Sequence, residues 1–532
     1  MRKINLSEKQ FNIGLLLLFM VFALYCALKA TKGLIIPVEQ DDYRDMAIAE
    51  NMLHGNYTHD PSYLNELLWY NPFLPAFNAI LSRITGLPLN IIVTHAGKFF
   101  NLLIPFSIYY MGVKLFDRKT ALAIAAASIF FVCGNDYGEH TSGYTYIWVA
   151  LCFSQVLFYV AIVFANKILQ EKKYIRYLLL GAFTGLLFLC HSATSFIFCI
   201  VLVCCFVHAF IKKEISFKEL ILNGLLFSAG LIVTGYPLLN NIFLHYHYTI
   251  KNVDPTQWVY FLFEPEQVSL FLKETINIYF VIAVIGLIAL TRNKIINKIT
   301  KRLILYWFWG STIIFLYVYF IVILRTKYNI NLPGFVPSSD VFFCVKSAEA
   351  VLFGVGFYEI VSWLFTKFGA SWKTVISAPF YSLLILLVLL RVPSYAHRKE
   401  YVLLRSQTVA RQEGFKQLMG VYSWLKTNTD INDVVLSKMD FANFPVMASG
   451  RKMVAAYVYY SSPYVSYLDR KKDADTMLSG LQTNANIQAL LTSYKVKYLL
   501  LPISDVKQYQ YAAGYFPAVA YSDSIFVVRK RQ

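Results

Sequence analysis

Long uninterrupted runs of apolar residues constrain the fold of this chain more than any other feature. Eleven runs can be placed, at 11–36, 92–115, 119–134, 143–166, 177–190, 194–211, 220–239, 272–291, 303–324, 341–365 and 374–392. A helix needs roughly 20 apolar residues to cross the hydrocarbon core of a bilayer. Charged residues make up only 15% of the chain, against roughly 25% in soluble proteins. The sequence therefore predicts a mostly α-helical, polytopic membrane bundle and excludes a soluble or disordered protein.

The basic residues are distributed unevenly between alternate loops. One set of loops holds 19 Lys and Arg residues, whereas the opposite set, ahead of residue 393, holds 5. Lys and Arg concentrate in the cytoplasmic loops of membrane proteins. We therefore expect the N-terminus in the cytoplasm, and the loop 37–91 and everything after about residue 393 outside. The net charge of +18 is then partly a topology signal and requires no nucleic-acid partner.

The region after residue 395 is more polar and alternates short helices with strands. Helices are predicted at 414–426 and 486–493, and strands at 433–437, 454–459, 498–501 and 524–528. This alternation is typical of a small α/β domain. The region contains no nucleophile elbow, glycine-rich phosphate loop or His/Cys cluster. We therefore predict a transmembrane module over 1–395 and an extracytoplasmic α/β accessory domain over 396–532.

Two adjacent carboxylates, Asp41 and Asp42, follow directly after the first apolar run. They precede a segment, 45–53, whose apolar residues recur at helical spacing, which predicts an amphipathic helix along the membrane surface. Carboxylates at this depth are costly and commonly functional. One of them can act as a general base, because a low-dielectric setting and a like-charged neighbour raise its pKa. Capping of the following helix is the alternative interpretation, and the sequence leaves both open.

The residues after this pair form a recognisable pattern. The stretch from Asp41 to Gly55 reads DDYRDMAIAENMLHG, and the proline-containing segments WYNPFLP, which starts at Trp69, and TGLP, which starts at Thr85, follow it. This order resembles the first outer loop of integral-membrane glycosyltransferases of the GT-C fold, of the dolichyl-phosphate-mannose mannosyltransferase type and of bacterial families 39 and 83. The chain departs from the pattern with Asp in place of Glu at position 42 and with Pro-Phe-Leu-Pro in place of Pro-Pro-Leu. The resemblance covers about the first 120 residues by motif and the rest only in architecture.

The resemblance implies an enzyme of a bacterial inner membrane that uses a polyprenyl-phosphate-linked sugar. It would transfer the sugar, with inversion, to a glycan, lipid or protein acceptor at the outer face of the membrane. By similarity, Asp41 is the catalytic base, while Asp42 tunes it, orients the acceptor or helps to hold a metal. The sequence names no certain cofactor and leaves a divalent metal, Mg²⁺ or Mn²⁺, open.

A leaving phosphate requires nearby positive charge. The outward-facing candidates for donor phosphate binding are Lys346, Arg325 and Lys327, with Arg44 as an alternative. Lys346 lies about two turns inside an apolar run with Glu349 three residues later, so it is predicted either to bind phosphate or to form an intramembrane ion pair. The residues expected at the acceptor or along the cavity are Tyr43, Glu139, His140, Tyr70 and Asn71.

Two other classes of function remain open on the sequence. A transport or other non-catalytic role in the export of lipid-linked glycans would fit a polytopic chain, although transporters more often show related halves and charges at mid-membrane. A glycan polymerase or ligase would also work at the outer face. Such enzymes depend on large outer loops with Arg or His rather than on an acidic pair in the first loop.

Overall fold

The computed structural model describes residues 7–37, 40–132, 142–171, 173–252, 276–330, 338–367, 377–438, 443–457, 460–480 and 482–532, together with residues 332 and 336. Its contacts divide the chain into two compact units. The helical unit comprises Met1–Lys32, Ala96–Gly235 and Thr256–Arg405, and the mixed unit comprises Gly33–His95, Tyr236–Pro255 and Ser406–Gln532. The loop predicted at 37–91 therefore belongs to the same compact unit as the C-terminal region. The predicted boundary near residue 395 itself stays a prediction.

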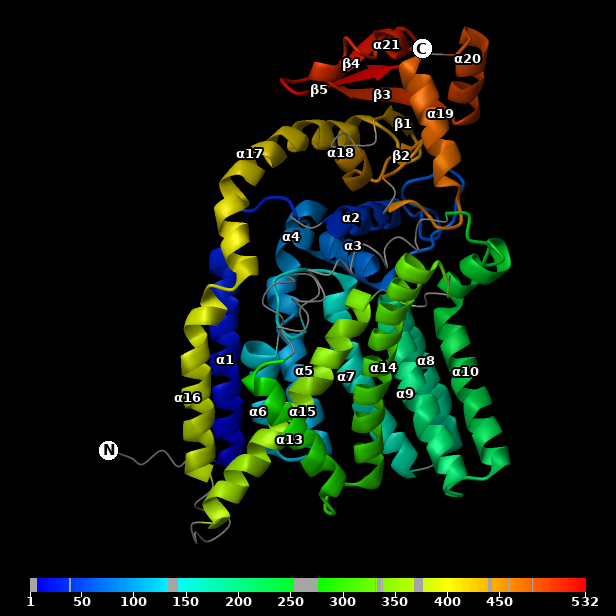
Figure 1. Ribbon diagram of the computed structural model, residues 1–532. Coiled ribbons are helices and arrows are strands. Elements are labelled where there is room, and N and C mark those ends of the chain that lie inside the picture. Colours follow the sequence, from blue (N-terminus) through cyan, green and yellow to red (C-terminus); the bar gives the residue numbers. More distant parts are fainter. Residues whose placement is uncertain are drawn as a thin grey trace. The chain divides into compact units, whose positions relative to one another are not determined.

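The helical unit is built from long apolar helices that run side by side (Figure 1). Its helices are α1 (Glu8–Ala30), α5 (Leu103–Leu115), α6 (Arg118–Ala126), α7 (Ala150–Glu171), α8 (Tyr174–Cys190), α9 (Ser192–Ile211), α13 (Ile278–Arg292), α14 (Lys298–Tyr328), α15 (Ser338–Lys367) and α16 (Ser377–Ala396), and a π-helical turn, η1 (Ala127–Phe131), continues α6. Three further helices cross the boundary between the units: α4 (Leu89–Phe100), α10 (Phe217–Leu239) and α17 (Lys399–Asn428).

Eight helices in the described part of the chain are long and apolar enough to cross a membrane. They begin at Glu8, Leu89, Ala150, Ser192, Phe217, Lys298, Asp340 and Ser377. Two of the other predicted runs form the shorter apolar helices α8 and α13, and the run at 119–134 becomes the short α6 and its π-helical turn. The chain is thus a multi-pass membrane protein with eight candidate spans, whereas eleven spans stay a prediction.

Glycines allow two helix pairs of the helical unit to pack closely. A Cβ atom added at Gly286 of α13 would overlap the backbone oxygen of Leu352, and one at Gly356 of α15 would overlap that of Ile282. Gly181 of α8 and Gly230 of α10 show the same reciprocal arrangement. Small residues at such crossings let backbones approach, which compensates for the weak hydrophobic driving force between helices in lipid.

The C-terminal part of the mixed unit contains a five-stranded mixed sheet. Its strands are β1 (Val434–Ser437), β2 (Lys452–Met453), β3 (Val496–Pro502), β4 (Ala518–Ser522) and β5 (Phe526–Lys530), in the order β2-β1-β3-β5-β4. Strand β1 pairs in parallel with β2 and β3, and β5 pairs antiparallel with β3 and β4. The strand predicted at 454–459 is wrong for residues 454–457. After Met453, whose amide donates to the Ser62 oxygen at 2.7 Å, the chain leaves the sheet.

Helices cover both faces of this sheet, because its strand residues alternate between two apolar cores. On one face, Val434, Leu436 and Leu499 pack against α19 (Tyr467–Ser479), α20 (Asn484–Ser493) and α21 (Gln510–Gly514). On the other face, Val435 and Leu500 pack against α17 and α18 (Asn443–Ala448). Two short helical turns, η3 (Asn240–His245) and η5 (Ile503–Asp505), also belong to this unit. The predicted mixture of helices and strands in this region is confirmed.

The second core extends to the first outer loop, which forms α2 (Gln40–Leu53) and α3 (Phe73–Thr85). Tyr43, Met46 and Ala47 of α2 belong to the same apolar cluster as residues of α17, α18 and the sheet. Every residue from 42 to 52 is buried, including those on the polar side of the helix. The helix predicted at 45–53 is therefore present as part of α2, with protein covering its polar side as well as its apolar side. Its place along the membrane surface stays a prediction.

One ion pair and the hydrogen bonds of a buried lysine join α2 and the loop after it to the C-terminal region. The Glu50 carboxylate pairs with Lys426 at 2.9 Å. The Lys452 ammonium, which is 1% exposed, donates to the Asn51 side-chain oxygen at 2.7 Å and to the Asp60 carbonyl at 2.6 Å. Burial lowers the pKa of Lys452 to about 8, although the Asp60 carboxylate acts in the opposite direction. These contacts fix the helix that carries the acidic pair.

Candidate functional site

The acidic pair lies in the first turn of α2, where carboxylates also favour the positive end of the helix dipole. The two side chains differ in exposure. The Asp41 side chain is 38% exposed, whereas Asp42 is 4% exposed. Asp41 is therefore the member of the pair that is open to a substrate.

Arg44 holds the Asp41 carboxylate from one turn further along the helix. Its two terminal nitrogens contact the two carboxylate oxygens separately, at 3.3 and 3.1 Å. The guanidinium also stacks over the Tyr70 ring, 3.5 Å from the centroid, and is 5% exposed. A bidentate Arg–carboxylate pair fixes orientation as well as distance. The Asp41 side chain is thus held in one orientation by a charge that is itself immobilised.

Asp45 is a third carboxylate of this site, and the sequence reasoning missed it. Its oxygen lies 3.6 Å from the Nε atom of Arg44, and its side chain is 1% exposed. Burial raises the pKa of Asp45 to about 7, Arg44 lowers it and Asp41 raises it further. A residue four positions after Asp41 lies on the same helix face, so helical spacing could have identified Asp45 as a neighbour.

The charge of Arg44 is secured by its partners. Burial by itself would lower the pKa of this guanidinium, but the carboxylates of Asp41 and Asp45 and the Tyr70 side chain raise it above its ordinary value. Arg44 was predicted as an alternative phosphate ligand. In the structure it serves Asp41 and Asp45, and its role towards phosphate stays a prediction.

The aromatic and amide residues predicted for the cavity are Tyr43 of α2 and the neighbouring residues Tyr70 and Asn71. The Tyr43 hydroxyl donates to the Pro37 oxygen at 3.2 Å, and its ring packs against Phe444 with centroids 5.4 Å apart. Tyr70 supports Arg44 as described, and Asn71 is buried next to it in the chain. Tyr70 therefore contacts Arg44, and Tyr43 packs within the core around α2. Contact of Tyr43, Tyr70 or Asn71 with the acceptor stays a prediction.

A tyrosine from the C-terminal region also lies at this site. Tyr460 is 2% exposed and belongs to the same apolar cluster as Tyr43 and Met46, and burial, followed by the charge of Asp41, raises its pKa. Nothing in the local sequence signals this proximity, because Tyr460 is remote from α2 in the chain. Only the folding of the mixed unit brings it there.

The other predicted phosphate ligands belong to the helical unit. Lys346 of α15 forms an ion pair with Glu349 at 2.8 Å, and the two side chains are 1% and 2% exposed. Arg325 and Lys327 lie in the last turn of α14. Of the two alternatives predicted for Lys346, the structure shows the ion pair with Glu349. Phosphate binding by Lys346, Arg325 and Lys327 stays a prediction. Glu139 and His140 lie outside the described residues.

The residues present do not assemble a divalent metal site in the part of the chain that the structure describes. No group of three or more His, Cys, Asp or Glu side chains suited to a metal ion occurs there. Both oxygens of Asp41 are engaged by Arg44. Mg²⁺ and Mn²⁺ require several oxygen ligands in near-octahedral geometry. We therefore derive no catalytic step through a metal.

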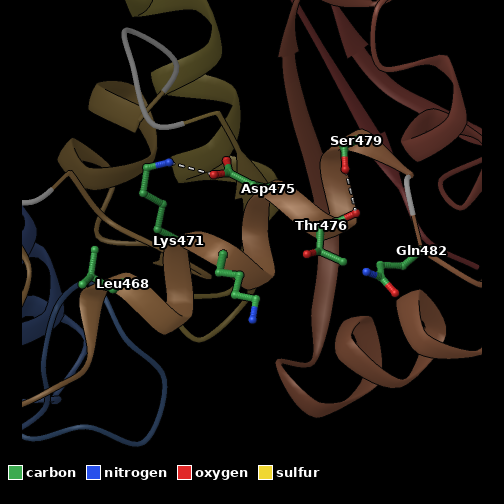
Figure 2. Close-up of a pocket in the computed structure, with 7 residues that line it drawn as sticks. Leu468, Lys471, Asp475, Thr476, Ser479 and Gln482 are labelled. Atoms are coloured by element: carbon green, nitrogen blue, oxygen red, sulfur yellow. Dashed lines mark hydrogen bonds and ion pairs between the residues drawn. The ribbon is translucent and has the colours of Figure 1, made fainter.

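A surface pocket of about 530 Å³ lies along α19 and is not part of this site. Figure 2 shows its lining, in which Lys471 pairs with Asp475 at 2.7 Å and the Ser479 hydroxyl reaches the Thr476 oxygen. The lining residues are Leu468, Lys471, Lys472, Asp475, Thr476, Ser479 and Gln482. None of the residues of the acidic motif contributes to it, so it offers no support for the predicted chemistry.

Sequence comparison and structural comparison give different results for this chain. No protein-family model matches the sequence, and no curated protein matches it. The structure, in contrast, resembles two crystal structures of ArnT from Cupriavidus metallidurans. The apo form matches with a TM-score of 0.55 at 13% identity, over 97% of this chain and 98% of that chain. The form bound to undecaprenyl phosphate matches with a TM-score of 0.53 at 12% identity, over 98% of each chain.

The oligosaccharyltransferase AglB from Archaeoglobus fulgidus is a second structural relative. Its complex with an inhibitory peptide and a dolichol-phosphate matches with a TM-score of 0.54 at 12% identity, over 96% of this chain and 72% of that chain. Identities this low carry the fold alone. The resemblance predicted from the first outer loop is confirmed at that level: this chain is a multi-pass membrane protein with the GT-C fold of glycosyltransferases.

Proposed function

We propose that this protein is a glycosyltransferase that moves a sugar from a polyprenyl-phosphate carrier to a glycan, lipid or protein acceptor. The GT-C fold supports this function, since structures of both relatives contain an isoprenoid phosphate, undecaprenyl phosphate for ArnT and a dolichol-phosphate for AglB. The observation that carries the proposal is the geometry of Asp41. It is a partly exposed carboxylate in the first turn of α2, fixed by a buried arginine.

In the proposed reaction, Asp41 accepts the proton of the acceptor hydroxyl. The acceptor oxygen forms a bond to the anomeric carbon while the bond from that carbon to the phosphate oxygen breaks. The electron pair leaves with the polyprenyl phosphate, and attack from the opposite face inverts the anomeric centre. Arg44 acts as a positioning residue, because a general base must be held within hydrogen-bond reach of the proton it removes. Its neighbour Asp42, which is buried, would support α2 rather than meet the acceptor directly.

Arg325, Lys327 and Lys346 stay the candidates for binding the leaving phosphate. Arg325 and Lys327 end α14, and Lys346 is buried in α15. Lys346 could serve only by sharing its ammonium between Glu349 and the phosphate. The full engagement of Arg44 with Asp41 and Asp45 favours a positioning role for that residue over phosphate binding.

We also infer the orientation of the chain from its charges. The excess of Lys and Arg in one set of loops supports a cytoplasmic N-terminus. With the eleven spans predicted from the apolar runs, the C-terminal domain would be extracytoplasmic, and the family resemblance would place the chain in a bacterial inner membrane. In this orientation α2 and the acidic pair lie at the outer face. Lipid-linked sugars are available there, whereas nucleotide sugars stay in the cytoplasm.

The test is a deletion strain complemented with the wild-type chain or with single variants, with lipid-linked glycans and their products profiled by mass spectrometry. Asp41→Asn should abolish the product that the wild-type chain restores and leave expression unchanged. Asp475→Asn is the matched control, because Asp475 is also a partly exposed carboxylate paired with a basic residue on its own helix. Wild-type product levels in the Asp41→Asn strain would rule out the base. An identical glycan profile with and without the chain would reject the transferase function.

A further inference from the structure

A single guanidinium serves two carboxylates on one face of α2. The terminal nitrogens of Arg44 hold the two Asp41 oxygens at 3.3 and 3.1 Å, and its Nε atom faces an Asp45 oxygen at 3.6 Å. That Nε atom and that oxygen are both buried and have no hydrogen-bond partner among the described residues. Buried polar atoms in proteins are almost always paired, so a near-contact of this kind at a functional site requires an explanation.

The hold of Arg44 on Asp41 opposes the role of Asp41 as a base. A carboxylate that receives a bidentate pair from arginine is stabilised in its ionised form and loses part of its affinity for a proton. In the proposed reaction, however, Asp41 must accept a proton from the acceptor hydroxyl. A negative charge at Asp45 acts in the opposite direction, because it attracts the same guanidinium and repels the charge of Asp41.

Asp45 can gain and lose this charge within an ordinary range of pH. Burial raises its pKa to about 7, Arg44 lowers it and Asp41 raises it. Side chains four positions apart on a helix are neighbours, and the electrostatic coupling between two such groups is reciprocal. The charge of Asp45 therefore increases the affinity of Asp41 for a proton by as much as the charge of Asp41 increases that of Asp45.

Arg44 and Asp41 are the charged groups that act on Asp45. Apart from Asp42, in the same turn, the other titratable groups around α2 lie more than one turn beyond Asp45 or are phenols, which are uncharged near pH 7. Helices α3 and α18, which pack on α2, add a single charged side chain, and it contacts the last residue of α2. These groups are Glu50 with its neighbours Lys426 and His54, Lys452, Arg83, Tyr70 and Tyr460.

We propose that Asp45 is a positioning residue that shares the guanidinium charge of Arg44 with Asp41 and thereby makes Asp41 a stronger proton acceptor. The inference rests on the proposed function and deepens it. When Asp45 is protonated, the charge of Arg44 stays with Asp41 and transfer is slow. When Asp45 is ionised, it takes up part of that charge through the Nε atom, and transfer is faster. The transfer rate therefore rises with pH through the titration of Asp45.

The experiment measures transfer rates at pH 6 and pH 8.5 in membranes of the complemented deletion strain, which supply the native donor and acceptor. Asp45→Asn has the shape of the protonated residue, so it leaves the charge of Arg44 on Asp41 at both pH values. We expect this variant to match the wild type at pH 6 and to be about three- to tenfold slower at pH 8.5, because one unit of proton affinity in a base changes the rate by up to about tenfold.

Asp60→Asn is the matched control. Asp60 is also a buried carboxylate of the mixed unit, and burial raises its pKa to about 6. Its charged neighbours are Lys452 and Glu66 instead of Arg44. One of its oxygens accepts from two backbone amides, at 2.7 and 2.9 Å, and the side-chain oxygen of asparagine can accept in the same way. Asp60→Asn should therefore keep the wild-type ratio between the rates at pH 8.5 and pH 6. Titration of the substrates affects all variants equally and cancels in this comparison.

The same ratio for Asp45→Asn as for Asp60→Asn, with Asp41→Asn inactive, would overturn the role of Asp45 and leave the proposed function standing. A loss of rate by one common factor at both pH values would show that Asp45 only supports the fold, and it would overturn the inference as well. An Asp41→Asn variant with wild-type activity would instead remove the function on which the inference rests. If Asp45→Asn does not fold, Asp45→Ser, which is smaller and also uncharged, is judged by the same ratio.

Discussion

Replacement of Arg44 by methionine tests the central arrangement of the site. The substitution removes the bidentate partner of Asp41, the stacking on Tyr70 and the positive charge 3.6 Å from Asp45. Asp41 is partly exposed, so water can replace part of its contact. Asp45 is 1% exposed and cannot be solvated in this way. Removal of one member of a buried ion pair typically costs about 3–5 kcal/mol, and we expect Arg44→Met to fall in this range at alkaline pH.

The cost should depend on pH, because Asp45 can take up a proton. Its folded-state pKa is about 7, above the ordinary value of 3.8 for an aspartate. The folded state therefore binds more protons than the unfolded state, and stability falls as pH rises from about 4 to 7. In the wild type this decline ends near pH 7. Without Arg44, which lowers the pKa of Asp45, the decline continues to higher pH. Each pH unit of continued decline costs about 1.4 kcal/mol, so between pH 7 and 8.5 the variant should lose about 2 kcal/mol more than the wild type.

The assay is thermal unfolding in detergent at pH 6 and pH 8.5, followed by intrinsic fluorescence. Arg44→Met should be clearly less stable than the wild type, and the difference should be larger at pH 8.5. The double variant Arg44→Met/Asp45→Asn should recover most of the alkaline loss, since no buried carboxylate is then left unpaired. An equal loss at both pH values, with no recovery in the double variant, would refute the assignment of Asp45 as the residue that Arg44 neutralises.

Two further substitutions test the packing around the site and in the membrane. Lys452→Met should lower the free energy of unfolding by about 3 kcal/mol, because it breaks the buried contacts to Asn51 and Asp60. Differential scanning fluorimetry measures the loss, and Lys471→Met at the surface is the control. An unchanged melting temperature of Lys452→Met would contradict the buried role of Lys452. Gly286→Val should strongly reduce the yield of monodisperse protein in size-exclusion chromatography, since its Cβ would overlap the Leu352 oxygen, whereas Gly224→Val, with open space around it, should not. Equal yields of the two variants would exclude close packing of α13 on α15.

Only the part of the site that lies within about one turn of α2 could be predicted from the sequence. Asp41, Arg44 and Asp45 recur at spacings of three and four, so they share a face of α2 whatever the rest of the chain does. Their partners could not be found in this way. Tyr70 reaches Arg44 across a loop, and Tyr460 comes from the far end of the chain. Contacts over such separations depend on packing, which leaves no periodic pattern in the sequence.

The burial of α2 was likewise predicted from the sequence only in part. Its apolar spacing predicted one covered face, yet its polar residues Glu50 and Asn51 are covered as well, by Lys426 and Lys452. By itself, the sequence determined the membrane helices and the place of the acidic pair after the first of them, because hydrophobic length and local spacing are properties of short segments. Only the tertiary structure decided which carboxylate is exposed, which is neutralised and which C-terminal tyrosine stands beside them, because desolvation and charge pairing arise only when distant segments exclude water together.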